Sequence, residues 1–250
     1  MADTILHDIT EGGTAVMTLS RLPVNALNPE FLAQIEKHLQ RLEADNLVRA
    51  VVISSATKVF SAGLDLKEAV DYSVPQQTAI VDGLNSCFAR LYGFPKPVVA
   101  AVNGAAIAGG LFFVLSADFA IAAEGAKLSL SEVRVGASFP VGPLEIARAT
   151  LSKSSFRRIL LSGRAVRADE AKAMGFIDDV QPKDLVMDRA MRVAGDYAGL
   201  PPQTFSAVKA QMRMPTLEII NDALKRNADA TRDGWFTSET ISAMKAALSP

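Results

Sequence analysis

The sequence predicts an α/β fold in which a mainly parallel sheet is covered by helices. Strand and helix signals alternate through the first half, and the strands are short apolar runs typical of strands buried on both faces. From about Gly142 onward strand signals nearly vanish and helical segments follow one another. The chain has 250 residues, 49% of them hydrophobic, which is enough for one large core. We expect an α/β core over residues 1–195 and a helical region over residues 196–250.

Each element has its own local signal. Asn28 is a good N-cap, and Pro29 sits at the first helical position, where its missing N–H costs nothing. Pro75 opens a second helix in the same way. The expected strands lie at 15–19, 49–54, 98–102 and 119–122, and the expected helices begin at 29, 75 and about 109. The predicted helical segments of the second half lie near 144–150, 152–161, 168–174, 184–198, 202–213, 216–230 and 235–247, separated by glycines and prolines.

Composition excludes several classes of function. The chain carries 26 Lys+Arg against 27 Asp+Glu with no basic block, so nucleic acid is not an expected partner. One cysteine, Cys87, excludes an internal disulfide and a cysteine metal site. No phosphate loop, dinucleotide fingerprint or metal-ligand spacing is present, and we expect no metal and no cofactor. The two histidines, His7 and His38, are interpreted as solvated surface residues.

Residues 97–117 contain no charge and are long enough to cross a bilayer. Pro97, Asn103, Gly104 and the Gly109-Gly110 pair instead favour a buried strand, a turn and a buried helix, so we expect no membrane association. The first residues lack the pattern of a signal peptide, and the last three are not a peroxisomal signal. With a single cysteine, these features indicate a soluble protein of a reducing compartment, and we expect it to be cytoplasmic.

Two glycine-containing turns each follow a buried strand. The first is Phe60–Leu66, with the sequence FSAGLDL, and the second is Asn103–Gly110, with the sequence NGAAIAGG. Either could be an ordinary connection with glycines for positive φ or close packing. Together, on adjacent strands, they can point unpaired backbone N–H groups into one crevice, with Gly109 at a helix N-terminus. Two such donors on one oxygen form an oxyanion hole.

These turns, together with Ala168-x-Glu-Ala-x-x-x-Gly175, resemble the signature segments of the crotonase (enoyl-CoA hydratase/isomerase) superfamily. The resemblance runs from Pro23–Leu27 to the C-terminal helices. It implies a spiral of ββα units over 1–195 and a C-terminal trimerisation region, with a homotrimer or dimer of trimers as the assembly. It also implies that acyl-coenzyme A is the substrate, with its thioester oxygen bound by the N–H groups of Leu64 and Gly109.

The side chains then indicate the reaction. Hydratases of this superfamily use two glutamates to add water, and the matching positions here are Phe112 and Glu132. One carboxylate is enough to move a double bond, because it can take a proton from one carbon and return it to another. An apolar Phe112 would exclude water and raise the pKa of Glu132. With the PVNALNPEFL segment at 23–32, this pattern resembles the mitochondrial-type Δ3,Δ2-enoyl-CoA isomerases.

Alternatives remain open at this point. Glu132 could simply face solvent or pair with Arg134. Another reaction that needs one acid, such as residual hydration or thioester hydrolysis, is a rival, as is an acyl-CoA-binding protein without activity. Assaying 2-enoyl-CoA for water addition separates hydration from isomerisation.

Supporting residues follow from the turns and the resemblance. Lys58 and Lys67 flank the first turn and could meet the phosphates of coenzyme A, and Asn25 and Ala26 could form part of the adenine pocket by resemblance alone. The aromatic residues of the tail are interpreted mainly as packing residues that could also reach the acyl chain. The full set of expected substrate-binding residues is Asn25, Ala26, Ser61, Ala62, Gly63, Asp65, Leu66, Lys67 and Phe112.

Overall fold

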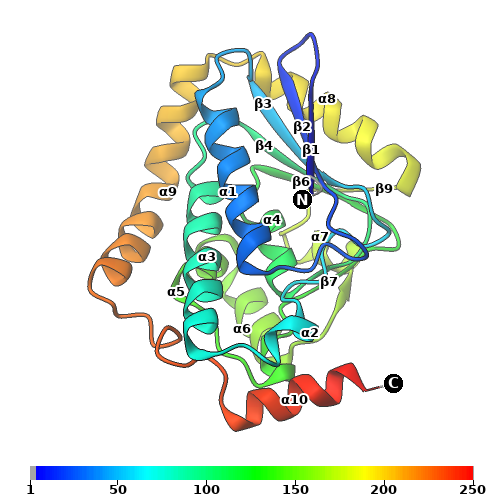
Figure 1. Cartoon of the computed structure of the whole chain (residues 1–250). Helices are drawn as coiled ribbons and strands as arrows, with labels where there is room; N and C mark the ends of the chain where they lie inside the picture. Colours follow the sequence, from blue (N-terminus) through cyan, green and yellow to red (C-terminus); the bar gives the residue numbers. More distant parts are fainter. Residues whose placement is uncertain (1–3, 250) are drawn as a thin grey trace.

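The computed structural model describes residues 4–249, and its centre is a six-stranded sheet (Figure 1). The sheet order is β1-β2-β3-β4-β6-β9. Only the edge pair β1–β2 is antiparallel, and every other neighbouring pair is parallel, as expected for strands joined by helices. The strands are β1 (Ile5–Ile9), β2 (Thr14–Leu19), β3 (Ala50–Ser55), β4 (Val98–Val102), β6 (Phe119–Ala123) and β9 (Asp179–Gln181).

A second, three-stranded sheet lies beside the first and carries the site loops. Its order is β5-β7-β8, with β5 (Ala106–Ile107) parallel to β7 (Lys127–Ser129) and β8 (Val166–Arg167) antiparallel to β7. The expected core strands are all present. The expectation that strands nearly end at Gly142 is wrong for β8 and β9. Both are two- or three-residue strands that pair with partners distant in sequence, so they leave no local pattern.

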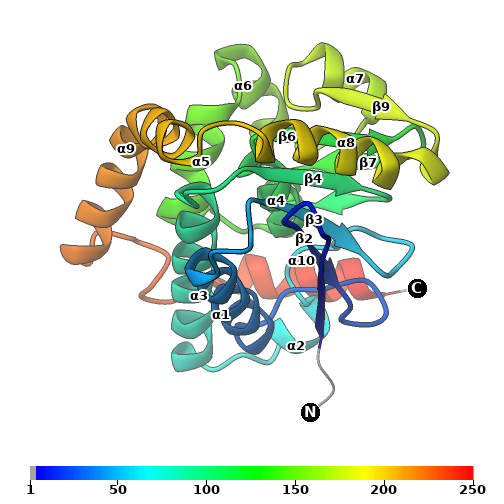
Figure 2. The ribbon, with the colours of Figure 1, turned by 90° about the horizontal axis from the view of Figure 1, so that it is seen from above.

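Helices cover both faces of the large sheet. In the view from above, α8 lies along one face, and α1 and α3 lie on the opposite side (Figure 2). The helices are α1 (Pro29–Ala44), α2 (Leu66–Ala69), α3 (Val74–Tyr92), α4 (Phe112–Leu115), α5 (Val141–Thr150), α6 (Lys153–Ser162), α7 (Ala168–Ala173), α8 (Val186–Ala198), α9 (Pro202–Lys225) and α10 (Ser238–Leu248), with 3₁₀ helices η1 (Ala108–Leu111), η2 (Glu132–Val135) and η3 (Lys183–Leu185).

The start of α1 confirms the N-cap prediction. The Asn28 side-chain oxygen accepts a hydrogen bond from the Phe31 N–H at 2.9 Å, and Pro29 is the first helical residue. The buried face of α1 includes Phe31, Leu32, Ile35 and Leu39, at the spacing of an amphipathic helix. This helix packs on α3 and closes one side of the sheet.

Helix α9 corrects one prediction. Two helices were expected on either side of Pro215, but a single helix runs from Pro202 to Lys225. Pro215 removes one helical hydrogen bond, and side chains of the preceding turns hold the helix against the core. Arg213 donates to the carbonyls of Tyr92 and Ser116, at 2.6 and 2.7 Å, and Lys209 donates to Asp118 at 2.6 Å. Tertiary contacts therefore outweigh the local break.

The uncharged segment at 97–117 is buried in the protein. It forms β4, a turn, β5, η1 and α4, as the strand–turn–helix interpretation predicts. Within residues 4–249, no helix has the length and apolar character needed to cross a bilayer.

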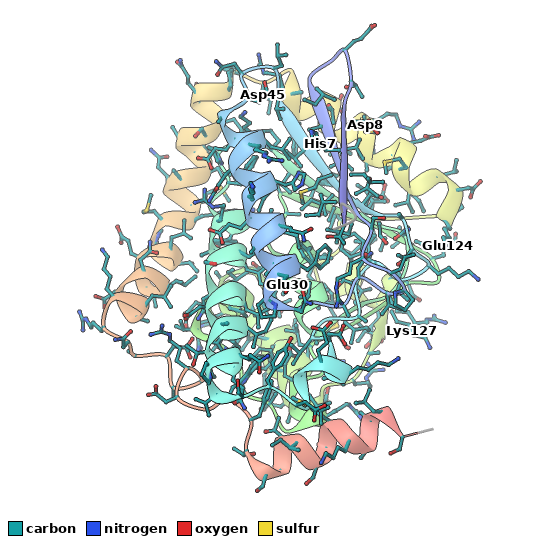
Figure 3. The ribbon with its side chains drawn as sticks, viewed as in Figure 1. His7, Asp8, Glu30, Asp45, Glu124 and Lys127 are labelled. Atoms are coloured by element: carbon teal, nitrogen blue, oxygen red, sulfur yellow. The ribbon has the colours of Figure 1, made fainter. Side chains whose placement is uncertain are left out.

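One histidine is buried where the sequence predicts a surface position. His38 was expected on the solvated face of its helix, but it is 6% exposed. Strand β1, which is absent from the expected strands, carries His7 (Figure 3). The His7 ring lies 5.4 Å from the His38 ring, between centroids. The polar side of α1 is therefore partly covered by the N-terminal hairpin.

Candidate active site

The two glycine-containing turns are in direct contact. The Ser61 N–H donates to the Ala105 carbonyl at 3.1 Å, and the Ile107 N–H donates to the Ser61 carbonyl at 3.0 Å. A Cβ built on Gly63 would lie 2.5 Å from the Ile107 carbonyl oxygen and 3.1 Å from the Gly109 nitrogen. Gly63 also has a φ of +76°. Glycine is therefore needed here both for the close approach and for the left-handed backbone. The convergence expected from the sequence is present.

The N–H groups of Leu64 and Gly109 are not used by the fold. The segment at Leu27 pairs with the first turn, with Leu27 N–H donating to Gly63 and Asp65 N–H donating to Leu27, and this pattern leaves out the Leu64 N–H. Gly109 is the second residue of η1, so its N–H precedes the first helical hydrogen bond. Among the described residues, neither N–H has a backbone or side-chain acceptor. Both residues line one cavity.

A buried polar cluster supports the first turn. Asn25 is 0% exposed, and its side-chain amide donates to Ser55 Oγ at 2.8 Å and to the Phe60 carbonyl at 3.0 Å. Ser61 is equally buried, and its Oγ donates to the Asn25 carbonyl at 2.8 Å. Both are expected to contact the substrate. In the structure their side chains are buried and hold the turn in place.

The other residues expected at the site lie in different surroundings. Ala62, Leu64, Leu66 and Phe112 line the cavity. Gly63 and Ala26 are buried but are not part of the lining. Asp65 forms an ion pair with Arg21 at 2.7 Å, which fastens the turn to the N-terminal loop. Lys58 and Lys67 are exposed, as a contact with a soluble phosphate would require.

The cavity has a volume of about 130 Å³ and is almost wholly apolar. Its lining includes Leu64, Gly109, Glu132, Phe139 and Trp235. Glu132 is the only ionisable side chain among the described residues that line it. A carboxyl group in such surroundings is a candidate acid–base group.

The environment of Glu132 excludes the surface interpretation. The residue is the first of η2 and is 7% exposed, and its Oε2 has no hydrogen-bond partner in the described structure. Arg134 turns away and donates to the Gly163 carbonyl at 2.8 Å, so it does not neutralise Glu132. Burial raises the pKa of Glu132 to about 8. A carboxyl group with this pKa can both accept and donate a proton near neutral pH.

Aromatic side chains keep the site dry around Glu132. Phe112 is 1% exposed, and its ring lies 5.5 Å from that of Phe88 and 6.5 Å from that of Phe139, between centroids. No second carboxyl group takes the place that Phe112 occupies in the lining.

Three of the lining residues carried no functional signal in the sequence. Phe139 and Pro143 come from the stretch before and within α5, and Val135 ends η2. Nothing in their local pattern distinguishes them from core residues. Trp235 was interpreted as a packing residue, and the structure places it in the cavity wall. In residues 4–249 no group of three or more His, Cys, Asp or Glu side chains is arranged to hold a metal ion.

Comparison with known proteins identifies the family to which this fold belongs. Residues 9–242 match the enoyl-CoA hydratase/isomerase family. The chain belongs to this family. It is therefore an enzyme of the enoyl-CoA hydratase/isomerase group, as the resemblance of its turns predicts. The crystal structure of human mitochondrial Δ3-Δ2-enoyl-CoA isomerase superposes with a TM-score of 0.93 at 27% identity, covering 98% of this chain and 96% of that one. The expected crotonase fold is confirmed.

Relatives within the family carry both activities in their names. The mitochondrial enoyl-CoA delta isomerase 1 of Rattus norvegicus is 31% identical over 91% of this chain and 79% of its own length. The 2,3-dehydroadipyl-CoA hydratase of Escherichia coli K12 is also 31% identical, over 79% of this chain and 77% of its own length. Since the hydratase and the isomerase match at the same identity, family membership alone does not distinguish the two reactions.

Proposed function

We propose that the enzyme is an isomerase that converts 3-enoyl-CoA to 2-trans-enoyl-CoA, with Glu132 as its one acid–base group. The observation that carries this proposal is the single carboxyl group of the cavity lining, in a cavity that two unbonded N–H groups also border. Addition of water in this superfamily uses two glutamates. One of the two is missing here, because Phe112 fills its position.

In the first step the Glu132 carboxylate removes a proton from C2 of the substrate. The C2–H electron pair becomes a carbon–carbon double bond, and the thioester carbonyl pair moves to oxygen, which gives a dienolate. The N–H groups of Leu64 and Gly109 donate to this oxygen. Each well-placed donor of this kind lowers the barrier by about 3–4 kcal/mol.

In the second step the protonated Glu132 returns the proton to C4. The C3–C4 double-bond pair forms the new C4–H bond, the C1–C2 pair becomes the C2–C3 double bond, and the oxygen electron pair re-forms the carbonyl. Both carbons must lie within reach of one carboxyl group, which the short cavity favours. Phe112 and Phe139 exclude the water that would be needed for hydration.

Two assays on one preparation test this proposal. We expect conversion of 3-hexenoyl-CoA to 2-hexenoyl-CoA, and water addition to 2-hexenoyl-CoA slower by at least about a hundredfold. Faster hydration than isomerisation would make the enzyme a hydratase. Binding of acyl-CoA without either reaction would make it a binding protein.

The pH dependence of the reaction follows from the raised pKa of Glu132. The base is active only as the carboxylate, so kcat/KM should rise with pH through an apparent pKa of about 8 and then reach a plateau. A rate that is already constant from pH 5 upward would show that Glu132 is not the base. Steady-state assays across this range, with the 3-enoyl-CoA concentration well below KM, provide the measurement.

The substrate and assembly expectations become part of the proposal. Acyl-coenzyme A is the substrate, with no further cofactor, and the exposed Lys58 and Lys67 are suited to its phosphates. We propose a homotrimer or dimer of trimers, which is supported by the exposed apolar residues of α9, namely Val208, Met212, Met214 and Ile219. The molar mass from light scattering tests the assembly.

A further inference from the structure

The chain between α9 and α10 forms a strap, residues 226–237, that runs from the end of α9 across to the start of α10 (Figure 1). Near its end lies Trp235, which is 6% exposed and lines the cavity. Its indole N–H donates to the Ser138 carbonyl at 2.9 Å, and its ring stacks on Phe236 at 5.1 Å between centroids. The indole is therefore fixed on both its polar and its apolar sides.

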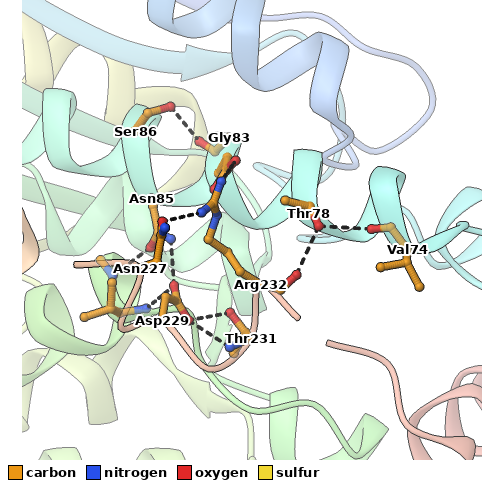
Figure 4. A network of polar contacts seen from close by, with 12 residues as sticks. Val74, Thr78, Gly83, Asn85, Ser86, Asn227, Asp229, Thr231 and Arg232 are labelled. Atoms are coloured by element: carbon orange, nitrogen blue, oxygen red, sulfur yellow. Dashed lines mark hydrogen bonds and ion pairs between the residues drawn. The ribbon is translucent and has the colours of Figure 1, made fainter. Parts of the chain in front are cut away.

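A network of polar contacts fastens the strap before it reaches the cavity (Figure 4). Asp229 accepts from the Asn85 side-chain amide at 2.8 Å and from the Val141 N–H at 3.1 Å, which joins the strap to α3 and to the start of α5. Asn85 in turn accepts from the Gly142 N–H at 2.8 Å. Asp229 also holds the strap's own turn by accepting from the Thr231 N–H at 3.0 Å and hydroxyl at 2.7 Å.

Further contacts fix the strap on either side of Trp235. The Arg232 guanidinium binds both carboxylate oxygens of Asp82, at 2.7 and 3.0 Å. The Phe236 N–H donates to the buried Gln77 side chain at 3.0 Å. A wall held at this many points cannot move aside without breaking several buried hydrogen bonds.

We infer that Trp235, held by the strap, is the residue that sets the acyl-chain length accepted by the cavity. Leu64, Gly109 and Glu132 line the same cavity as Trp235, Pro140 and Pro143. The fixed aromatic ring and the two prolines bound an apolar space of only about 130 Å³, so the enzyme selects short acyl chains. The inference rests on the proposed acyl-CoA site, and it names the class of substrate which that site takes.

Binding of saturated acyl-CoA tests the inference without requiring turnover. In the unaltered protein we expect calorimetry to show dodecanoyl-CoA binding no more tightly than hexanoyl-CoA. In Trp235→Ala the affinity should keep rising with chain length, by about fourfold for each CH₂ that enters the space. Dodecanoyl-CoA should then bind at least about tenfold more tightly than hexanoyl-CoA. Phe205→Ala, which removes an aromatic ring that packs on Tyr197 away from the cavity, is the matched control and should leave the ratio unchanged.

The unaltered protein alone can overturn the inference, even if Trp235→Ala does not fold. Trp235 is the only tryptophan of the chain, so its fluorescence reports directly on this wall. An affinity that rises steadily from hexanoyl-CoA to dodecanoyl-CoA, or fluorescence unchanged by bound hexanoyl-CoA, contradicts the inference. If short chains bind selectively but 3-hexenoyl-CoA is not isomerised, the inference stands and the proposed reaction fails. If no acyl-CoA binds, both fail.

Discussion

Replacement of Glu132 by glutamine is expected to lower kcat for 3-hexenoyl-CoA isomerisation by at least about a thousandfold. Glutamine keeps the size of the side chain but can neither take the proton from C2 nor deliver it to C4. Acyl-CoA affinity should remain within about threefold, because the cavity walls and the two N–H donors are untouched. Steady-state kinetics with calorimetric binding measures both quantities.

The matched control is Glu124→Gln. Glu124 is exposed on the outer surface, away from the cavity, so its replacement should leave kcat unchanged (Figure 3). Equal losses in the two variants, or full activity in Glu132→Gln, would exclude Glu132 as the acid–base group.

The pH dependence of the free energy of unfolding tests separately whether Glu132→Gln is folded. The buried carboxyl group binds its proton more tightly in the folded state, where its pKa is about 8, than in the unfolded state, where it is 4.5. The free energy of unfolding of the unaltered enzyme therefore falls as the pH rises through this window. Glutamine carries no charge to bury, so Glu132→Gln should be more stable than the unaltered enzyme above pH 8. Urea unfolding at several pH values checks the sign.

The second large effect is expected from Gly63→Ala. A Cβ at this position would approach the Ile107 carbonyl to 2.5 Å and the Ala108 Cβ to 2.9 Å, on a backbone with φ of +76°. The two turns must separate, which displaces the N–H groups of Leu64 and Gly109 from their shared cavity. We expect kcat to fall by about a hundredfold and the free energy of unfolding to fall by about 2 kcal/mol.

Gly195→Ala is the control for Gly63→Ala. Gly195 lies inside α8, and a Cβ there meets nothing within 4 Å. Alanine is the better helix former, so this variant should gain about 0.5–1 kcal/mol of stability with unchanged kcat. Normal activity in Gly63→Ala would show that the contact between the two turns does not organise catalysis.

Features with local signals were predictable from the sequence. The N-cap at Asn28 and the buried run at 98–102 are set by a few neighbouring residues, and the structure has both. Gly63 was predictable because only glycine permits the close approach of the two turns, and a Cβ on Gly109 would lie 2.8 Å from the Leu27 side chain. The position of Glu132 in the cavity required the family resemblance as well, since its alternating segment is compatible with a surface residue.

Features set by distant contacts were not predictable. The α9 helix continues through Pro215 because Arg213 and Lys209 are anchored to the core around residues 92–118. Asn25 supports the first turn because its side-chain amide donates to Ser55 and to the Phe60 carbonyl, and these residues are 30 and 35 positions away. Trp235 enters the cavity wall only because the strap before it is fastened to α3 and α5.

The fate of the C2 hydrogen tests the central claim most directly. With 3-hexenoyl-CoA deuterated at C2, a single carboxyl group sheltered from water should carry deuterium to C4 of the 2-hexenoyl-CoA product. Mass spectrometry and proton NMR of the product from the first turnovers measure this transfer. We predict deuterium at C4 in a substantial fraction of the product. A product whose new C4 hydrogen comes entirely from the solvent would contradict proton transfer by Glu132 alone.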